Sequence, residues 1–395
     1  MSAQKKPGAT LLALTASVLC LPGYSGDAQA WADSEAQTGY RFSAYRESPL
    51  PADKTNGLNG ERYSVDSHQF RVLWPSSKSL DFTADMTFET MSGASPWFIV
   101  PDAGGKPIQV MSGATIWDRR AALQLNTRHY DEASRETLSV SVSKERDYLS
   151  LNGGLEGAWD FNERLTTLSA GAGYSYDELR PTDGESTRFP MRIASASKNT
   201  ATVYAGLSQV LGPQTVVQWG LSYNFENGYL SDPYKQAYVA GNILPDHRPD
   251  RRNEYAATMK LRHYFQDIGA AVHVDYRYYR DSWRIAASTL ELSWHQNLPA
   301  QWQLVPAVRY YSQAYAGFYQ PYYTAARGDG DYSSDYRLSA YGALSLRLGL
   351  MTDWRQWSFS LNGERYRSSG SYAIRSVNMD NPGLVNFTVI SAALG

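Results

Sequence analysis

The residues that could perform chemistry are scattered along the chain and fall into no catalytic or metal-binding motif. Neither an HExxH nor an EF-hand pattern occurs, and no two histidines lie at metal-ligand spacing: His68, His129, His247, His263, His273 and His295. In alternating segments, His273 and His295 share their parity with charged residues. They are interpreted either as a metal or proton site or as ordinary hydrogen-bonded residues. The sequence therefore predicts no cofactor and no metal.

Two serines are the best candidates for a nucleophile. Ser92 and Ser112 each lie in a copy of Met-Ser-Gly-Ala, at 91–94 and 111–114. A nucleophile needs a base and a third group that orients the base. No histidine is close to either serine in sequence, and the GxSxG pattern is missing. Hydrolysis is therefore the least favoured function, and Gly93 and Gly113 are interpreted as loop hinges.

The N-terminus predicts export. Lys5 and Lys6 precede an apolar run at 11–21, and an Ala-Gln-Ala sequence ends at Ala30, as in a signal peptide that is cleaved there. This divides the chain into a signal at 1–30 and a single domain at 31–395. The one cysteine, Cys20, lies in the signal, and Leu19 before it does not suit a lipoprotein site. The mature chain is then expected to have no disulfide and, without CxxCH, no c-type haem.

Composition favours strands over helices. The 37 Lys and Arg nearly balance the 39 Asp and Glu, which gives no reason to expect nucleic acid as a partner. The chain has 29 Tyr, 11 Trp and 31 Gly at a mean hydropathy of −0.46, a combination typical of strands and turns. After the N-terminal run, no segment has the about 18 apolar residues that a membrane-spanning helix needs.

Alternation of apolar and polar residues is the main structural signal. In the segment 80–90 the even positions are mostly apolar, while Asp81, Asp85 and Glu89 occupy odd positions. Because successive side chains of a strand point to opposite faces, this segment predicts a strand with one apolar and one acidic face. Similar long segments recur from about residue 39 almost to the end of the chain.

Short and long connections alternate between these segments. Two connections, near 146–147 and 280–282, are tight, but otherwise short polar ones alternate with long ones. This asymmetry is typical of an outer-membrane barrel with short periplasmic turns and long external loops. The short ones are 75–78, 131–134, 161–164, 211–214, 266–267, 299–301 and 352–355, and the long ones are about 47–61, 91–112, 180–195, 229–251, 316–334 and 369–382.

The expected fold is an all-β transmembrane antiparallel barrel of about 16 strands with both termini in the periplasm. Aromatic residues at segment ends, such as Trp74 and Trp354, suit interfacial girdles. Pro306 predicts a bulge or a local loss of pairing. The polar faces would line the lumen, and the candidate lumen-facing residues are Arg71, Asp81, Asp85, Glu89, Arg128, Lys260, Arg262, His273, Asp275, Arg277, Glu291, Arg337 and Arg347.

Seven segments carry a resemblance to a known family. They are DSHQFRVLWP at 66–75, MSGASPWF at 91–98, GKPIQVMSGATIWDR at 105–119, LTTLSAGAGYSYDE at 165–178, VHVDYRYYRDSW at 272–283, WQLVPAVRYYSQ at 302–313 and YSSDYRLSAYGALS at 332–345. In these segments the chain resembles the proteobacterial family named domain of unknown function 3570. The resemblance implies an outer-membrane β-barrel over nearly the whole mature chain, and it implies no activity for particular residues.

Two functions without catalysis follow. A barrel of about sixteen strands is wide enough for an aqueous channel, so passage or recognition of a small solute is the leading expectation. Because the lumen charges have mixed sign, strong ion selectivity is not expected. The alternative is a scaffold that docks a periplasmic, lipoprotein or surface partner, for example in an envelope redox or protein-modification system. Other expected partners are the lipid of a Gram-negative outer membrane and, during insertion, the barrel-assembly machinery.

Overall fold

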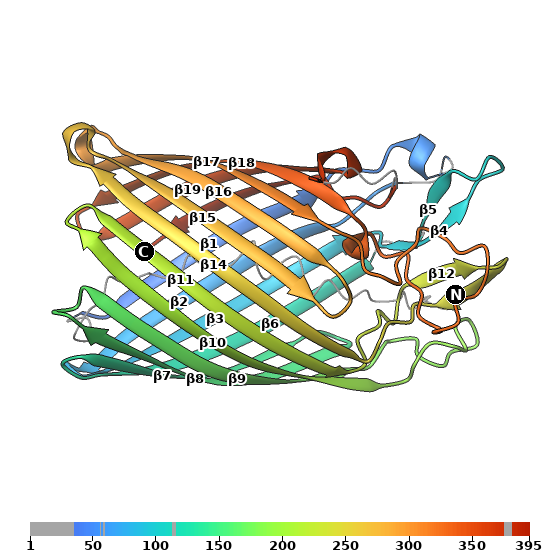
Figure 1. Ribbon diagram of the computed structural model, residues 1–395, viewed down its shortest axis with the longest axis horizontal. Coiled ribbons are helices and arrows are strands. Elements are labelled where there is room, and N and C mark those ends of the chain that lie inside the picture. The colour runs from blue at the N-terminus through green and yellow to red at the C-terminus, as the bar shows by residue number, and fades with distance from the viewer. Residues whose placement is uncertain (1–34, 56, 58–59, 113–115, 375–380) are drawn as a thin grey trace, which may run out of the picture.

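The computed structural model describes residues 35–55, 57, 60–112, 116–374 and 381–395. They form one closed ring of sixteen antiparallel strands (Figure 1). In ring order the strands are β1 (Gln37–Glu47), β2 (Ser64–Ser77), β3 (Leu80–Gly93), β6 (Ile116–Tyr130), β7 (Ser134–Lys144), β8 (Tyr148–Phe161), β9 (Thr166–Leu179), β10 (Ala196–Gly212), β11 (Thr215–Gly228), β14 (Arg251–Phe265), β15 (Ala270–Asp281), β16 (Ala286–Asn297), β17 (Trp302–Gln313), β18 (Tyr341–Trp354), β19 (Trp357–Ser369) and β20 (Phe387–Leu394).

The remaining described elements are short. Two hairpins lie outside the ring, one of β4 (Pro96–Pro101) with β5 (Pro107–Met111) and one of β12 (Gln236–Val239) with β13 (Asn242–Pro245). The 3-10 helices are η1 (Ala52–Lys54), η2 (Gln266–Ile268), η3 (Pro299–Gln301), η4 (Tyr336–Leu338) and η5 (Gly370–Tyr372). Among the described residues, no helix has the length and apolar character needed to cross a membrane.

The first and last strands close the ring. β1 pairs antiparallel with β20, with Tyr40 opposite Leu394 and Glu47 opposite Phe387. The predicted all-β class and the strand number of about sixteen are confirmed. The strand number is even, so β1 begins and β20 ends at the same end of the barrel. The predicted signal peptide, 1–30, lies outside the described residues.

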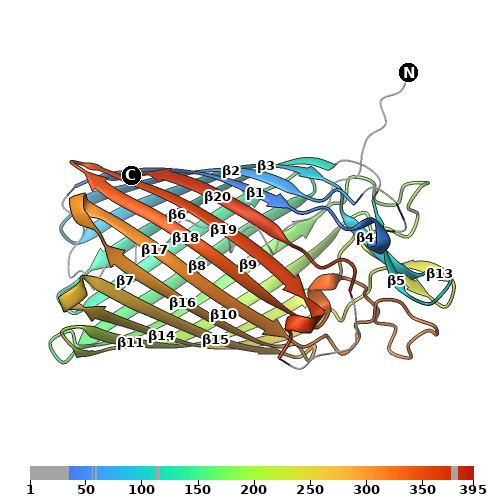
Figure 2. The ribbon, with the colours of Figure 1, turned by 90° about the horizontal axis from the view of Figure 1, so that it is seen from above.

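The two ends of the barrel differ as the alternation of connections predicts. Short turns join β2 to β3, β6 to β7, β8 to β9, β10 to β11, β14 to β15, β16 to β17 and β18 to β19 at one end, the turn end. The hairpins and long connections gather at the other, the loop end (Figure 2). The two tight connections at the loop end, β7 to β8 and β15 to β16, are also where the sequence placed them.

The outer face of the barrel is apolar. Leu155 is 65% exposed and Leu221 is 66% exposed. A soluble sandwich would bury such side chains, whereas a lipid-facing barrel wall exposes them. Near the turn end, the rings of Trp74 and Phe82 lie 6.0 Å apart on this face. Such aromatic placement fits an interfacial girdle.

Pro306 removes pairing on one side of its strand. β16 and β17 pair at Ser293 with Ala307 and again at Gln296 with Leu304, and no pair is formed between these positions. The register is the same before and after the gap, so the strand loses pairing locally and does not bulge. On its other side Pro306 is paired with Leu348 of β18. The missing N–H of proline explains the one-sided gap.

At the loop end the interior contains packed apolar side chains. One buried cluster joins β1, β2, β3 and β20, with the rings of Tyr366 and Phe387 stacked at 4.4 Å. A second cluster includes Trp283 and Phe318 from the loops after β15 and β17. Because these residues sit at the loop ends of the strands and pack inward, the loops fold over the mouth of the barrel.

Candidate functional site

The acidic face of β3 lines the lumen, and each of its carboxylates pairs with an arginine of a neighbouring strand. The pairs are Arg71–Asp85 at 2.6 Å, Arg120–Glu89 at 3.4 Å and Arg128–Asp81 at 3.8 Å. Tyr130 also donates to Asp81 at 2.7 Å. One-to-one pairing neutralises this wall, so the row of carboxylates is not arranged as a catalytic group.

The wall formed by β14 to β18 has more cations than anions. Arg262 makes two hydrogen bonds to Asp275, at 2.5 and 3.0 Å, and Arg347 pairs with Glu291. Both carboxylates at the middle of this wall are therefore already engaged.

Three cations on the same wall have no such partner. Lys260, Arg277 and Arg309 are exposed, and none of them forms an ion pair with any residue that the structure describes. Register places Lys260 and Arg309 on the lumen side, because Lys260 lies opposite Asp275 and Arg309 lies opposite Glu291. Arg277 lies two residues after Asp275 in β15 and therefore shares its face. Arg309 was not among the predicted lumen residues. The available signal was its place between Val308 and Tyr310, which share the opposite face of the strand.

Two histidines meet in the lumen. The rings of His273 and His295 lie 3.9 Å apart between their centroids. Ser293 is within 3.1 Å of the Nε2 of His295, and Gln303 is within 3.4 Å of its Nδ1. Parity assigned both residues to the lumen but did not predict that they are neighbours, because they lie on different strands and the register of β15 with β16 brings them together.

One lumen prediction is wrong, and the two hinge predictions have different outcomes. Arg337 lies in η4 within the loop between β17 and β18, because Asp335 accepts from its amide at 3.1 Å and turns the chain before β18 begins at Tyr341. Gly93 ends β3 with a φ of +131°, and a Cβ there would lie 2.3 Å from the carbonyl oxygen of Arg62. Gly113 lies outside the described residues.

Three loops from distant parts of the ring meet over the mouth. We call the loops from β3 to β6, β11 to β14 and β17 to β18 the three-loop cap. Their roots are separated by six, four and six strands around the ring. Nevertheless, Lys235 donates to the carbonyl of Pro96 at 2.9 Å, and Arg248 pairs with Asp335 at 2.9 Å. Loops with such roots can meet only across the lumen axis, so the cap covers the loop end.

Buried charges hold the cap together. The Asp335 side chain is fully buried, with Lys235, Arg248 and Arg337 at 3.9, 2.9 and 2.5 Å. Burial acts to raise the pKa of Asp335, but Arg337, Lys235 and Arg248 together outweigh it and hold the pKa well below its usual range. Burial lowers the pKa of Lys235. Arg337 also reaches Asp232 at 2.8 Å. Sequence parity contains no signal for this network, because its members are loop residues.

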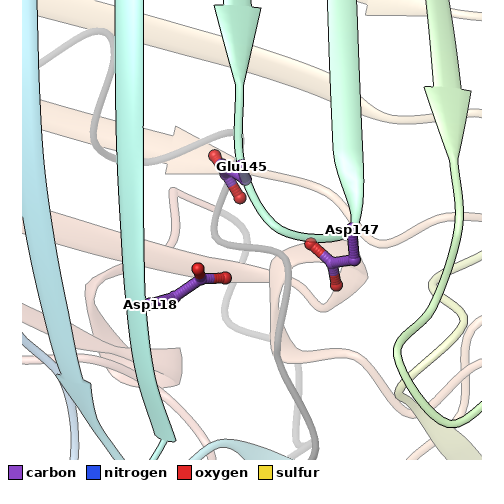
Figure 3. A group of neighbouring side chains, drawn as sticks. All are labelled: Asp118, Glu145 and Asp147. Atoms are coloured by element: carbon purple, nitrogen blue, oxygen red, sulfur yellow. The ribbon is translucent and has the colours of Figure 1, made fainter.

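A separate acidic group lies at the loop end. Asp118 of β6 and Glu145 and Asp147 of the β7 to β8 turn each bring one carboxylate oxygen within 4.8 Å of the others (Figure 3). Burial, followed by the charges of Asp147 and Asp118, raises the pKa of Glu145 to about 8. Burial also raises the pKa of Asp147. The sequence marked the connection at Asp147 as tight but did not predict its carboxylate neighbours.

The proposed nucleophiles frame a hairpin. Ser112 accepts a hydrogen bond through its Oγ from the Ser95 amide at 3.1 Å, and its own amide donates to the Ser95 carbonyl at 2.9 Å. These bonds close the base of the β4–β5 hairpin. Ser92 is a residue of β3 and lies opposite Ser64 and Trp117. Both serines therefore have structural positions where the β3 to β6 loop leaves the barrel wall.

The apolar outer face, charged interior, short turns at one end and long loops at the other define an outer-membrane β-barrel of a Gram-negative envelope. A family described as "Protein of unknown function (DUF3570)" matches residues 11–378. The chain belongs to this family, as its sequence resemblance predicted. No curated protein matches the chain.

Several solved barrels are similar in fold. A bacterial polysaccharide outer membrane secretin has 10% identity and a TM-score of 0.47, covering 90% of this chain and 97% of its own. The siderophore receptor PirA from Pseudomonas aeruginosa has 11% identity and a TM-score of 0.43, covering 84% of this chain. This chain spans 56% of that receptor. A loop-deleted OmpT, an outer membrane protein of Vibrio cholerae, has 9% identity, a TM-score of 0.43 and coverages of 91% and 99%.

Proposed function

We propose that the barrel passes or binds a small anionic solute at the outer membrane. The observation that carries the proposal is the surplus of cations on the β14 to β18 wall. At the middle of this wall, Arg262 and Arg347 engage Asp275 and Glu291, which leaves Lys260, Arg277 and Arg309 exposed toward the lumen. The expectation of weak ion selectivity, which rested on the overall mixture of signs, is revised for this wall.

The chemistry of these side chains fits carboxylates or phosphates. Fixed cations on a low-dielectric wall raise the local concentration of anions. The planar guanidinium groups of Arg277 and Arg309 can bind an oxyanion with two parallel hydrogen bonds, and Lys260 adds a point charge. The paired wall of β2, β3 and β6 offers no comparable surplus, so an anion would be bound on one side of the lumen.

Conductance of the purified full chain in planar bilayers tests the proposal. With a salt gradient, we expect a reversal potential that shows preference for chloride over potassium. Substitution of all three cations, Lys260→Gln, Arg277→Gln and Arg309→Gln, should reduce that preference, because the lumen wall then has no surplus positive charge.

A matched variant controls for net charge. Lys78, Arg146 and Arg355 are exposed residues of connections, and their replacement by Gln removes the same three charges without changing the lumen wall. This variant should keep the selectivity of the unaltered chain. Conductance equal to that of a protein-free bilayer, or equal selectivity in both triple variants, would contradict the anion channel.

The three-loop cap supports a second candidate, a scaffold that docks an envelope partner. A mouth crossed by Lys235, Arg248 and Asp335 restricts passage and presents a fixed surface. Affinity purification from native outer membranes should then return the barrel with a recurrent partner. Repeated recovery of the barrel alone, together with measurable conductance, would favour the channel over the scaffold.

The proposal includes contact with outer-membrane lipid and export through a cleaved signal peptide. Arg365 and Arg367 lie near the loop end of β19, on the face that carries the lipid-facing residues of this strand. They suit the anionic headgroups of the outer leaflet. Export would use cleavage after Ala30, followed by insertion by the barrel-assembly machinery. Mass spectrometry of protein from outer membranes should give a mature N-terminus at Trp31, and an uncleaved chain would contradict the proposed signal.

A further inference from the structure

Three carboxylates from two parts of the wall converge inside the loop end. Asp118 belongs to β6, and Glu145 and Asp147 belong to the turn between β7 and β8. Their exposed fractions are 2%, 5% and 4%. Figure 3 shows the three carboxylate groups turned toward a common space, with one oxygen of each within 4.8 Å of the others. Ionised carboxylates repel at this separation unless something lies between them.

Each of the three retains a buried oxygen without a hydrogen-bond partner among the described residues. These are Oδ2 of Asp118, Oε2 of Glu145 and Oδ1 of Asp147. The other oxygens of the aspartates are in use, since Oδ1 of Asp118 accepts from the Arg119 amide at 2.7 Å and Oδ2 of Asp147 accepts from the Tyr234 hydroxyl. An unmatched buried acceptor is costly, and three in one place indicate a ligand that satisfies them together.

The surrounding charges do not compensate for the group. Besides each other, the carboxylates are influenced by Glu89 from β3 and by Asp232 from the β11 to β14 loop, both negative. Arg120 is the cation that acts on Glu145, and it already pairs with Glu89 at 3.4 Å. The site therefore has an excess of buried negative charge, which folded proteins neutralise with a partner or a metal ion.

We propose that Asp118, Glu145 and Asp147 bind a calcium ion. All three donors are oxygens, which hard cations prefer over the nitrogen and sulfur ligands of transition metals. Opposite ligands of Ca²⁺ are roughly 4.6 to 5.2 Å apart, so oxygens within 4.8 Å fit one coordination shell, and water completes it. Mg²⁺ demands a tighter and more regular octahedron.

The ion would fasten a loop to the barrel wall. It would join β6 to the β7 to β8 turn, and Tyr234, which donates to Asp147, extends the connection into the β11 to β14 loop of the cap. Calcium removal should therefore loosen the contact between this loop and the wall. The inference does not depend on whether the barrel conducts anions.

Terbium luminescence provides a direct test on the refolded full chain. Tb³⁺ replaces Ca²⁺ on oxygen ligands, and the Tyr234 ring beside Asp147 can sensitise it. We expect luminescence that Ca²⁺ displaces at a lower concentration than Mg²⁺. The double variant Asp118→Asn with Glu145→Gln should lose at least tenfold in Tb³⁺ affinity. The control Asp53→Asn, at an exposed carboxylate of the same barrel end, should bind like the unaltered chain.

A second measurement guards against a variant that fails to fold. Heat-modifiable migration on gels must show that each variant forms the barrel, and calorimetric titration of the unaltered chain with Ca²⁺ requires no substitution. If neither Tb³⁺ nor Ca²⁺ binds the unaltered chain, a proton shared among the carboxyls satisfies the group and the inference is overturned. Equal Tb³⁺ affinity in the folded double variant, or stronger competition by Mg²⁺, would overturn it as well.

Discussion

At the scale of residues, the backbone conformation at position 93 restricts the residue there to glycine. Its φ of +131° is a value that residues with a side chain rarely adopt. The space is also closed, because an added Cβ would meet the backbone of Arg62 at 2.3 Å. The glycine therefore allows β3 to end against the segment that leads into β2.

Substitution of Gly93 should reduce folding. Gly93→Val is expected to lower the yield of heat-modifiable barrel severalfold, because the new side chain adds both a clash and an unfavourable φ. Gly363→Ala is the matched control, since nothing lies within 4 Å of a Cβ at that strand position. Equal refolding yields for the two variants, measured by gel mobility, would show that the β3 terminus tolerates a side chain.

The alternation of residues predicts the face of a side chain but not its ion-pair partner. Lys260 and Arg262 have the same parity, and the sequence assigns both to the lumen. The structure separates them, because Arg262 is engaged by Asp275 while Lys260 is exposed without an ion pair to a described residue. Parity determines which face a side chain takes. Pairing depends on strand register and on side-chain conformation, which parity does not contain.

At the scale of elements, the pairing of β1 with β20 closes the barrel and can be tested by cross-linking. Ser43 lies opposite Ser391. In a Cys20→Ser background, the pair Ser43→Cys with Ser391→Cys should form a disulfide on mild oxidation, because facing Cα atoms in a ladder lie within disulfide range. Non-reducing gels would show altered migration of the unfolded chain.

A shifted pair serves as the control for this register. Ser43→Cys with Ala393→Cys keeps both residues on one face but moves them two positions apart, since Ala393 lies opposite Arg41. This variant should cross-link much more slowly. Faster cross-linking of the shifted pair would indicate a slipped closure of the ring.

The three-loop cap should respond to loss of a buried cation. Arg248 is 9% exposed and pairs with Asp246 and Asp335, both fully buried at their side chains. Arg248→Ala is expected to destabilise the cap by about 3 to 5 kcal/mol, because it leaves buried carboxylates short of a partner. Limited proteolysis should then cut the β11 to β14 loop faster, while the barrel keeps its heat-modifiable migration.

An exposed ion pair in the cap provides the comparison. Arg327 and Asp329 pair within the β17 to β18 loop with side chains 27% and 47% exposed. Arg327→Ala should cost about 0 to 1 kcal/mol, as is usual for surface pairs. If Arg327→Ala and Arg248→Ala accelerate proteolysis equally, the buried network does not hold the cap.

At the scale of the whole molecule, the barrel and its cap should be separable. Replacement of the cap residues 319–333 with a short flexible linker should increase single-channel conductance, because the β17 to β18 loop no longer crosses the mouth. The protein should still partition into the outer-membrane fraction, since the ring of strands is intact. Unchanged conductance would mean that the cap does not limit passage, and recovery as a soluble periplasmic protein would contradict the barrel in the membrane.

Local sequence was sufficient to predict the barrel, the approximate number of strands, the asymmetry of its ends and the face of most charged residues. Those features depend on local alternation and turn composition, and the Pro306 gap was predictable for the same reason. The three-dimensional structure was needed to show that His273 meets His295, that Arg337 belongs to the cap, and that Asp118 lies beside Glu145 and Asp147. These contacts are fixed by strand register, side-chain packing and loop folding, which the local alternation of residues does not encode.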